Sequence, residues 1–236
     1  MPATFAVVLA AVSWQVSVDG PLLGVDTGTR HAVRELRHLL HSTLVNHLGA
    51  ALSDLGGSVP AVPVLLAAAV LTAVRRRRSG TPSRWWLPLP AAVAATALVP
   101  LLVVPAKAWF ARPGPYGQPL SPDQWGWYPS GHTATSAIAY GTAALLLGGT
   151  LAADARPLLY TGTALLCLGV GCGLVWSDYH WLLDVLASWC LAGLVLWAGA
   201  RLLARLLPRC TPNDGPGTAG PDWTAGRAGG SGRGGG

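Results

Sequence analysis

Apolar residues in this chain gather into long runs that short polar stretches separate. Six of these runs come near the roughly 20 residues that a helix needs to cross the hydrocarbon core of a bilayer. They occupy positions 4–18, 55–74, 87–105, 133–153, 157–175 and 181–200. The pattern predicts an all-α integral membrane protein, built as an antiparallel bundle of about six transmembrane helices.

Composition leads to the same class of protein. Of the 236 residues, 51% are hydrophobic and only 11% are charged, a balance that a soluble core could not absorb. We therefore expect a multi-pass protein of the plasma membrane, with the lipid bilayer as its immediate surroundings.

The segment 19–58 is the only sizeable polar stretch before the candidate motifs. Its leucines recur near the helical period, which favours an amphipathic helix on the outer membrane surface. They are Leu36, Leu39, Leu40, Leu44, Leu48 and Leu55. His38 and His41 in this segment could ligate a metal, although a solvated helix face is the interpretation that we favour.

On this pattern the chain divides into three parts. Residues 1–58 hold the first transmembrane helix and the outer amphipathic segment, and residues 55–207 form the transmembrane core. Residues 208–236 are rich in Gly and Pro and poor in apolar side chains, so we predict a disordered cytoplasmic tail there.

The arginines predict which way the bundle faces, because positively charged loops are retained on the cytoplasmic side. Those near the apolar runs fall on a single face of a six-span topology. They are Arg75, Arg76, Arg77, Arg78, Arg84, Arg156, Arg201, Arg205 and Arg209. The net charge of +6 therefore reflects the membrane topology of the chain. Nucleic-acid binding is not expected, because the basic residues cluster at helix ends.

Two histidines on the opposite, outward face are the strongest candidates for chemistry. His132 ends the sequence Tyr-Pro-Ser-Gly-His at the start of the fourth run, and His180 stands at the start of the sixth. Asp184 follows His180 by four residues, so the two share a face if both are helical. A carboxylate that accepts one ring N–H leaves the other nitrogen free to attack an electrophile.

Cations and a helix start make an anion site plausible beside these histidines. Lys107 is the only lysine, and Arg112 follows it in the same outer loop. Ser130 is placed to cap the fourth helix, whose first N–H groups would point outward, and Gly131 would allow close approach to the backbone. The simpler alternatives are a lysine that extends to the headgroups and an ordinary capped helix start.

Together these residues resemble the type 2 phosphatidic acid phosphatase family of membrane lipid phosphatases. The family's second motif, Pro-Ser-Gly-His, matches in full at residues 129–132, and its third, Ser-Arg-x5-His-x3-Asp, keeps His180 and Asp184. The first motif, Lys-x6-Arg-Pro, keeps Lys107 but has Gly114 at the arginine position. Arg112 matches an additional arginine that the family often carries two residues earlier.

The third motif departs from the family as well. Its Ser-Arg pair falls on Gly173 and Leu174, so a second phosphate-binding arginine is absent. Asp178 does not replace this arginine, because a negative charge would repel phosphate. Losing one preorganised donor typically costs about 100- to 1000-fold in rate, so the two departures bear directly on activity.

The resemblance implies a mechanism that uses neither a cofactor nor a metal. His180 would attack phosphorus to give a phosphohistidine, Asp184 would hold its ring, and His132 would protonate the leaving oxygen and later activate water. The phosphoryl oxygens would lie against Lys107, Arg112, Ser130 and the Gly131 backbone.

The implied substrate is a phosphorylated membrane lipid. Polyprenyl pyrophosphate, phosphatidic acid and phosphatidylglycerol phosphate all remain open as substrates, and the oligomeric state is open as well.

Three other functions stay open too. One is a catalytically weakened protein that binds or transports a phosphorylated lipid, and another is a transferase that uses the same histidines. The third is a channel or structural bundle with accidental motif matches, in which the motif residues would not converge.

Overall fold

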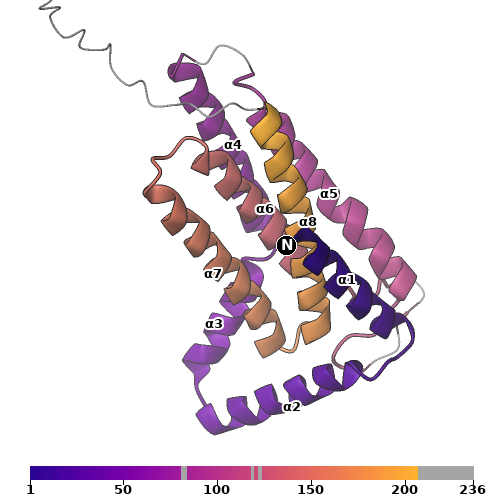
Figure 1. The fold of residues 1–236 in the computed structure, drawn as a ribbon. Helices are drawn as coiled ribbons and strands as arrows, with labels where there is room; N and C mark the ends of the chain where they lie inside the picture. Colours follow the sequence, from indigo (N-terminus) through magenta and orange to yellow (C-terminus); the bar gives the residue numbers. More distant parts are fainter. Residues whose placement is uncertain (81–83, 118–119, 122–123, 207–236) are drawn as a thin grey trace, which may run out of the picture.

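The computed structural model describes residues 1–80, 84–117, 120–121 and 124–206, and the predicted tail at 208–236 lies outside them. Within these ranges the chain is all-α, without a strand (Figure 1). Its helices are α1 (Pro2–Ser17), α2 (Leu23–Leu40), α3 (Thr43–Asp54), α4 (Ser58–Arg78), α5 (Pro88–Phe110), α6 (Gly131–Gly148), α7 (Ala155–Trp176) and α8 (Leu182–Leu206). The predicted fold class is confirmed.

Each of the six apolar runs forms a helix, namely α1, α4, α5, α6, α7 and α8. Four of them, α4, α5, α7 and α8, are long and apolar enough to cross a membrane, whereas α1 is apolar but shorter. α6 carries more polar residues, and most of its side chains are buried among neighbouring helices, where they do not face lipid. The count of six spanning helices therefore stays a prediction.

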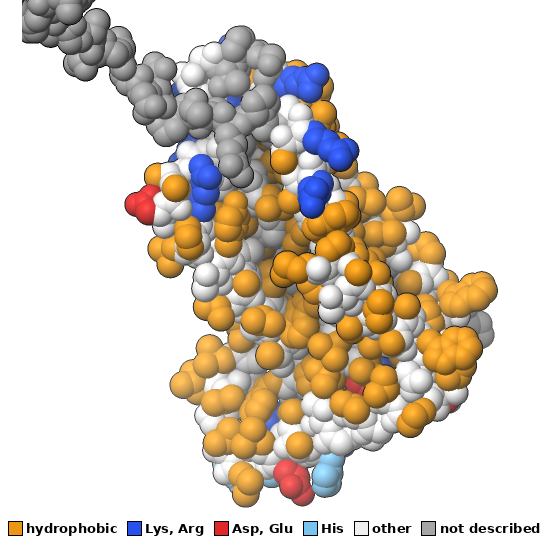
Figure 2. All heavy atoms as spheres, in the orientation of Figure 1, with side chains coloured by type: hydrophobic (Ala, Val, Ile, Leu, Met, Phe, Trp, Pro, Cys, Tyr) orange, Lys and Arg blue, Asp and Glu red, His pale blue; other side chains and the backbone are white. Residues whose placement is uncertain are grey.

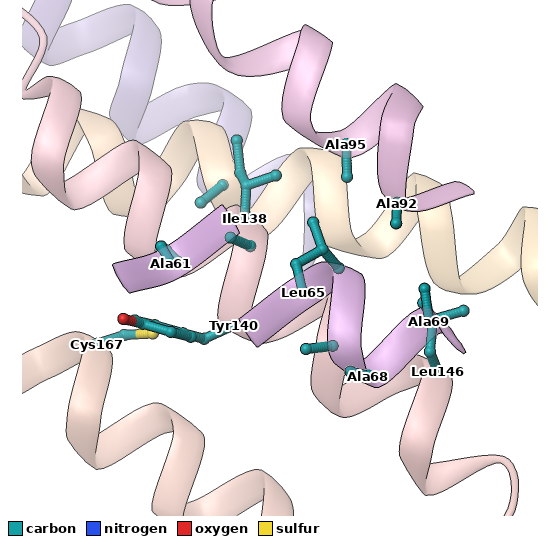
Figure 3. Packing of buried hydrophobic residues seen from close by; sticks show 14 residues of the cluster. Ala61, Leu65, Ala68, Ala69, Ala92, Ala95, Ile138, Tyr140, Leu146 and Cys167 are labelled. Atoms are coloured by element: carbon teal, nitrogen blue, oxygen red, sulfur yellow. The ribbon is translucent and has the colours of Figure 1, made fainter. Parts of the chain in front are cut away.

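α6 is the centre of the bundle. It packs against α4, α5, α7 and α8, while α1 lies along α8 (Figure 1). The core around α6 is built largely from alanines, which let helix backbones approach closely (Figure 3). Larger side chains such as Leu65, Ile138 and Tyr140 fill the space between these alanines.

The polar segment differs from the single amphipathic helix that we predicted. The chain leaves the helical conformation at His41, whose φ is 44°, and Ser42 then caps a second helix by accepting a hydrogen bond from Val45 N. α2 runs across one end of the bundle, and α3 turns to lie along α7 (Figure 1). Glycines permit this close contact, because a Cβ on Gly173 would lie 2.6 Å from the carbonyl oxygen of Gly49.

The balance of charge differs between the two ends of the molecule. Lysine and arginine side chains gather at the end where α4 finishes, and acidic and histidine side chains are visible at the α2 end (Figure 2). α4 ends in four consecutive arginines, Arg75 to Arg78. The α2 end is also where α6 and α8 begin, so it carries the residues singled out in the sequence.

Candidate active site

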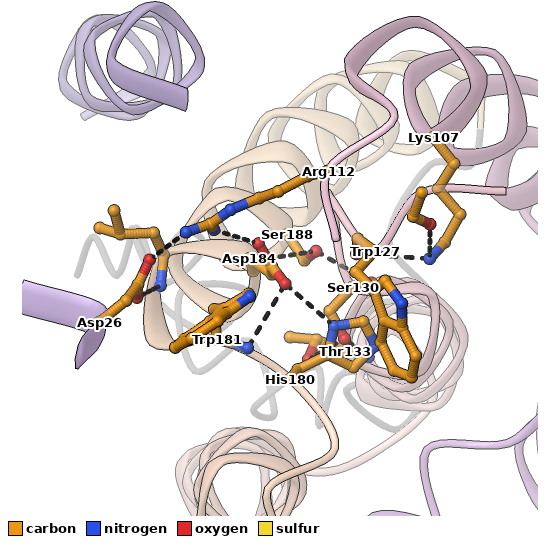
Figure 4. Close-up of polar contacts among 12 residues, drawn as sticks. Asp26, Lys107, Arg112, Trp127, Ser130, Thr133, His180, Trp181, Asp184 and Ser188 are labelled. Atoms are coloured by element: carbon orange, nitrogen blue, oxygen red, sulfur yellow. Dashed lines mark hydrogen bonds and ion pairs between the residues drawn. The ribbon is translucent and has the colours of Figure 1, made fainter. Parts of the chain in front are cut away.

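The candidate residues come together at the α2 end of the bundle (Figure 4). Lys107 lies in the last turn of α5, Ser130 caps α6, and His180 belongs to the turn between α7 and α8. Asp184 lies in the first turn of α8. This convergence argues against the interpretation in which the motif matches are accidental.

His180 and Asp184 form the predicted pair, although His180 stands just before α8 and not within it. His180 Nδ1 lies 3.2 Å from Asp184 Oδ2, and the backbone N–H of Trp181 donates to the same oxygen at 3.4 Å. The turn itself is held by Leu174, whose carbonyl accepts hydrogen bonds from the backbones of Tyr179 and His180. The imidazole is thus fixed by both its ring and its backbone.

The surroundings of His180 favour a neutral ring. Burial lowers the pKa of His180, and the hydrogen bond to Asp184 opposes this only in part. The indole of Trp127 meets the ring edge-on, with centroids 5.3 Å apart. A neutral imidazole that donates its Nδ1 proton to Asp184 keeps a lone pair on Nε2, which is what a nucleophile requires.

Ser130 confirms the prediction of an N-cap at α6. Its hydroxyl accepts a hydrogen bond from Thr133 N at 3.3 Å, and its backbone N–H donates to Asp184 O at 3.2 Å. Ser188 links the same two helices, with Oγ 2.9 Å from Ser130 O and 2.8 Å from Asp184 O. The start of α6, whose first N–H groups have no backbone partner within the helix, is thereby held against the start of α8.

Lys107 and His132 both lie at the start of α6. Lys107 Nζ donates to the carbonyls of Gly126 and Trp127 at 2.9 and 3.3 Å, and its Cε would be 3.9 Å from a Cβ on Gly131. The His132 ring lies against the turn between α3 and α4, within electrostatic range of His180. The α6 N-terminus therefore has an ammonium and an imidazole beside it.

Arg112 has partners that the sequence did not predict. Its guanidinium is buried between two carboxylates, with Nη2 2.5 Å from Asp26 Oδ2 and Nη1 2.6 Å from Asp184 Oδ1. It also lies over the ring of Trp181. We had expected Arg112 to face phosphate, whereas both of its terminal nitrogens are engaged by protein carboxylates.

The two positions that lack the family's arginines are closely packed. Gly114 lies against Trp127, and a Cβ there would fall 2.5 Å from the indole ring. Leu174 is buried in a small apolar cluster with Val170 and Val185. Neither position has room for an arginine without rearrangement of its neighbours.

α2 supplies charged residues that the sequence analysis missed. Arg30 and Arg34 donate to the two oxygens of Asp178 at 3.0 and 3.1 Å, and Arg37 lies 3.8 Å from the same carboxylate. The signal was in the sequence, because Asp26, Arg30, Arg34 and Arg37 recur at helical spacing and so share one face. The negative charge of Asp178 is therefore compensated by α2.

An apolar groove leads to the site between α4, α5 and α6. It has a volume of about 340 Å³ and is lined mainly by small and aliphatic side chains, among them Val62, Val99 and Val103. Lys107 and Gly131 stand at its polar end. The groove thus connects a hydrocarbon-lined space with the candidate phosphate-binding groups.

No group of three or more His, Cys, Asp and Glu side chains suited to a metal occurs among the described residues. His38 and His41, the pair considered above, are separated by the end of α2. The arrangement near His180 consists instead of a histidine–carboxylate pair, a helix N-terminus and an ammonium.

The fold and site define a class of protein: a multi-pass helical membrane protein with a buried histidine–aspartate pair at one end. Residues 85–208 match the PAP2 superfamily. The match covers more than half of the chain, so the protein belongs to this superfamily, and the resemblance seen in the motifs is confirmed.

A solved structure supports the fold over a larger part of the chain. The structure is described as the first transmembrane PAP2 type phosphatidylglycerolphosphate phosphatase from Bacillus subtilis, and it is similar with a TM-score of 0.70. The two chains are 20% identical over 88% of this chain and 98% of the other. No curated protein matches the sequence.

Proposed function

We propose that the protein is a membrane phosphatase that hydrolyses a lipid phosphate or pyrophosphate at the extracytoplasmic face. The observation that carries this proposal is the pair of His180 and Asp184, held beside the N-terminus of α6 and Lys107. Membership of the PAP2 superfamily and the motif match at His132 support the same reaction class. The face is proposed from the arginine-rich opposite end, which would be cytoplasmic.

In the first proposed step, the lone pair on His180 Nε2 forms a bond to phosphorus. The bond from phosphorus to the leaving oxygen breaks, and His132 donates a proton to that oxygen. Asp184 stabilises the positive charge that the His180 ring acquires. Lys107 and the first N–H groups of α6 would stabilise the charge on the phosphoryl oxygens.

In the second step, water attacks the phosphohistidine. His132, now neutral, takes a proton from the water as its oxygen bonds to phosphorus, and the phosphorus–nitrogen bond breaks. The products are inorganic phosphate and a neutral His180, so the enzyme returns to its starting state. Every proton moves between His132, the leaving group and water, and Lys107 with the α6 N–H groups would offset the phosphoryl charge, so the proposed steps use no metal.

The apolar groove supports a lipid substrate over a soluble one. Its aliphatic lining and its polar end at Lys107 suit a hydrocarbon chain with a phosphate at its tip. The similar solved structure is that of a phosphatidylglycerolphosphate phosphatase, and phosphatidylglycerol phosphate therefore belongs among the first substrates to be tested. Polyprenyl pyrophosphate and phosphatidic acid have the same combination of chain and phosphate.

The decisive experiment measures phosphate release by detergent-solubilised protein from a panel of lipid phosphates and pyrophosphates, with and without a metal chelator. We expect release that persists in the chelator and is lost in His180→Ala. Phosphate release by the His180→Ala variant would overturn the histidine mechanism. Loss of phosphate release in the presence of the chelator would overturn metal independence.

The second candidate function is a catalytically weakened protein that binds or transports a phosphorylated lipid. The observation that favours it is the absence of the family's arginines, since Gly114 and Leu174 fill their positions and Arg112 is engaged by carboxylates. It predicts lipid-phosphate binding that survives His180→Ala and no turnover by the folded native protein.

A further inference from the structure

Asp26 of α2 is buried in the candidate active site although it lies far from the motifs in the sequence. Its side chain is only 2% exposed. Oδ1 accepts a hydrogen bond from the backbone N–H of Leu183 at 2.8 Å, and Oδ2 binds Arg112 at 2.5 Å. The carboxylate thus joins α2 to the first turn of α8 and to the loop after α5.

Arg112 connects Asp26 to His180 through Asp184. Its other terminal nitrogen binds Asp184 Oδ1 at 2.6 Å, and Asp184 Oδ2 faces His180 Nδ1 at 3.2 Å. Asp26, Arg112, Asp184 and His180 therefore form a continuous chain of charged and hydrogen-bonded groups (Figure 4). Because every link is buried, each contact is stronger than it would be in water.

We propose that Asp26 is a positioning residue of the active site: it shares the positive charge of Arg112 with Asp184, and so holds that carboxylate in the orientation that aligns His180. The inference rests on the proposed function, because it concerns the same site. Asp26 does not touch His180 and acts through Arg112 and Asp184 alone. A carboxylate that orients a histidine is itself commonly held by further hydrogen bonds, and such outer contacts influence activity.

The substitution Asp26→Asn separates the two contacts of this carboxylate. The asparagine carbonyl can still accept the hydrogen bond from Leu183 N, whereas its NH₂ group would face the Arg112 NH₂ group, and two donors cannot bond. The full charge of Arg112 would then rest on Asp184. Glu35→Gln is the matched control, because it makes the same chemical change at an exposed position on the same helix.

Charged groups on several elements lie around His180. They are Asp184 on α8, Lys107 and His132 on α5 and α6, Arg112 after α5, Asp26 and Arg30 on α2, and Asp178 in the same turn. The substitution neutralises Asp26, which reaches the ring only through Arg112 and Asp184. With Asp26 neutral, the net charge around the ring becomes more positive. A protonated His180 is then disfavoured further, so its titration moves to lower pH.

The test measures kcat, KM and the pH profile of phosphate release for the native protein, Asp26→Asn, Asp26→Glu and Glu35→Gln. We expect Asp26→Asn to lower kcat by about 10- to 100-fold with little change in KM, and to move the acid limb to lower pH. Asp26→Glu should restore the acid limb, and Glu35→Gln should match the native protein.

Two results would overturn the proposal. A lower KM or higher activity in Asp26→Asn would mean that Asp26 competes with phosphate for Arg112. An unchanged kcat and pH profile in the folded fraction, with only lower thermal stability, would mean that the contact is purely structural.

A second measurement separates this inference from the proposed function. NMR on protein with labelled histidines follows the titration of the His180 ring, and His180→Gln assigns its signal. If the native protein releases no phosphate but Asp26→Asn still moves the His180 titration to lower pH, the phosphatase proposal fails and the positioning role stands. If the titration does not move, the positioning role fails whatever the activity.

Discussion

At the scale of single residues, the site is a set of buried charges that compensate one another. Arg112 lies between Asp26 and Asp184, and the arginines of α2 surround Asp178. Removing one partner from a buried ion pair leaves a charge that costs about 3–5 kcal/mol. Substitutions here therefore change stability and activity together, which is why conservative variants are needed to separate the two effects.

The pH dependence of activity follows from the burial of His180, which lowers the pKa of this ring from its ordinary value of about 6.5. The protonated ring has no lone pair on Nε2. Since protonation occurs only as pH falls through the lowered pKa, we expect the acid limb of the kcat/KM profile, where activity falls with decreasing pH, to be centred below pH 6.5. His31→Gln, at an exposed histidine, should leave the profile unchanged. An acid limb centred above pH 6.5 would contradict this assignment.

Gly114 tests how tightly the first-motif loop is packed. A Cβ at this position would lie 2.5 Å from Trp127, so Gly114→Ala should destabilise the fold by about 1–3 kcal/mol through overpacking. Gly28→Ala is the matched control, because nothing lies within 4 Å of a Cβ there and alanine favours the helix. Thermal unfolding in detergent measures both variants. Equal midpoints for the two would show that Trp127 moves aside without cost.

At the scale of elements, α2 is attached to the bundle through charges more than through a broad apolar face. Arg30 and Arg34 bind Asp178, and Asp26 binds Arg112 and Leu183 N. Several leucines of this helix remain exposed, Leu39 most of all, as suits a helix that lies at the membrane surface. The attachment of α2 should therefore depend on a few carboxylates.

Asp178→Asn provides a clean test of that attachment. Asp178 has a φ of 58°, a conformation that asparagine tolerates well, so the substitution removes the charge without straining the turn. We expect faster amide hydrogen exchange along α2, while α7 and α8 keep the native rate. The exposed Asp19→Asn, also at positive φ, is the control. Unchanged exchange in α2 would show that its arginines contribute little to docking.

At the scale of the whole molecule, the separation of charge predicts how the protein sits in a membrane. The arginine-rich end should be cytoplasmic and the α2 end should face outward. This orientation would bring the site to the headgroups of the outer leaflet, and the groove between α4, α5 and α6 would open toward its acyl chains.

Cysteine labelling in intact cells tests the orientation. In a variant whose native cysteines are replaced by alanine, Glu35→Cys on α2 should react with a membrane-impermeant maleimide. Asp154→Cys, in the exposed turn before α7, should react only after the membrane is permeabilised. The reverse pattern would place the site in the cytoplasm and would contradict the proposed face.

The sequence by itself determined the local and periodic features. Long apolar runs predict helices that are buried or that meet lipid, so α1, α4, α5, α6, α7 and α8 could be located from hydropathy alone. The Ser130 cap and the pairing of His180 with Asp184 follow from short spacings, which local geometry translates directly into contacts. The superfamily could be recognised from the sequence for the same reason, because its motifs are short and continuous.

Only the tertiary structure decided which distant charges meet. Asp26 and Arg112 are 86 positions apart, and Arg30 and Asp178 are 148 apart, so no local rule relates them. The break at His41 and the contacts that α2 makes with α7 and α8 are likewise features of the folded chain. A buried charge must find a partner wherever the fold brings one within reach, and that partner is set by the arrangement of helices and not by the spacing of residues.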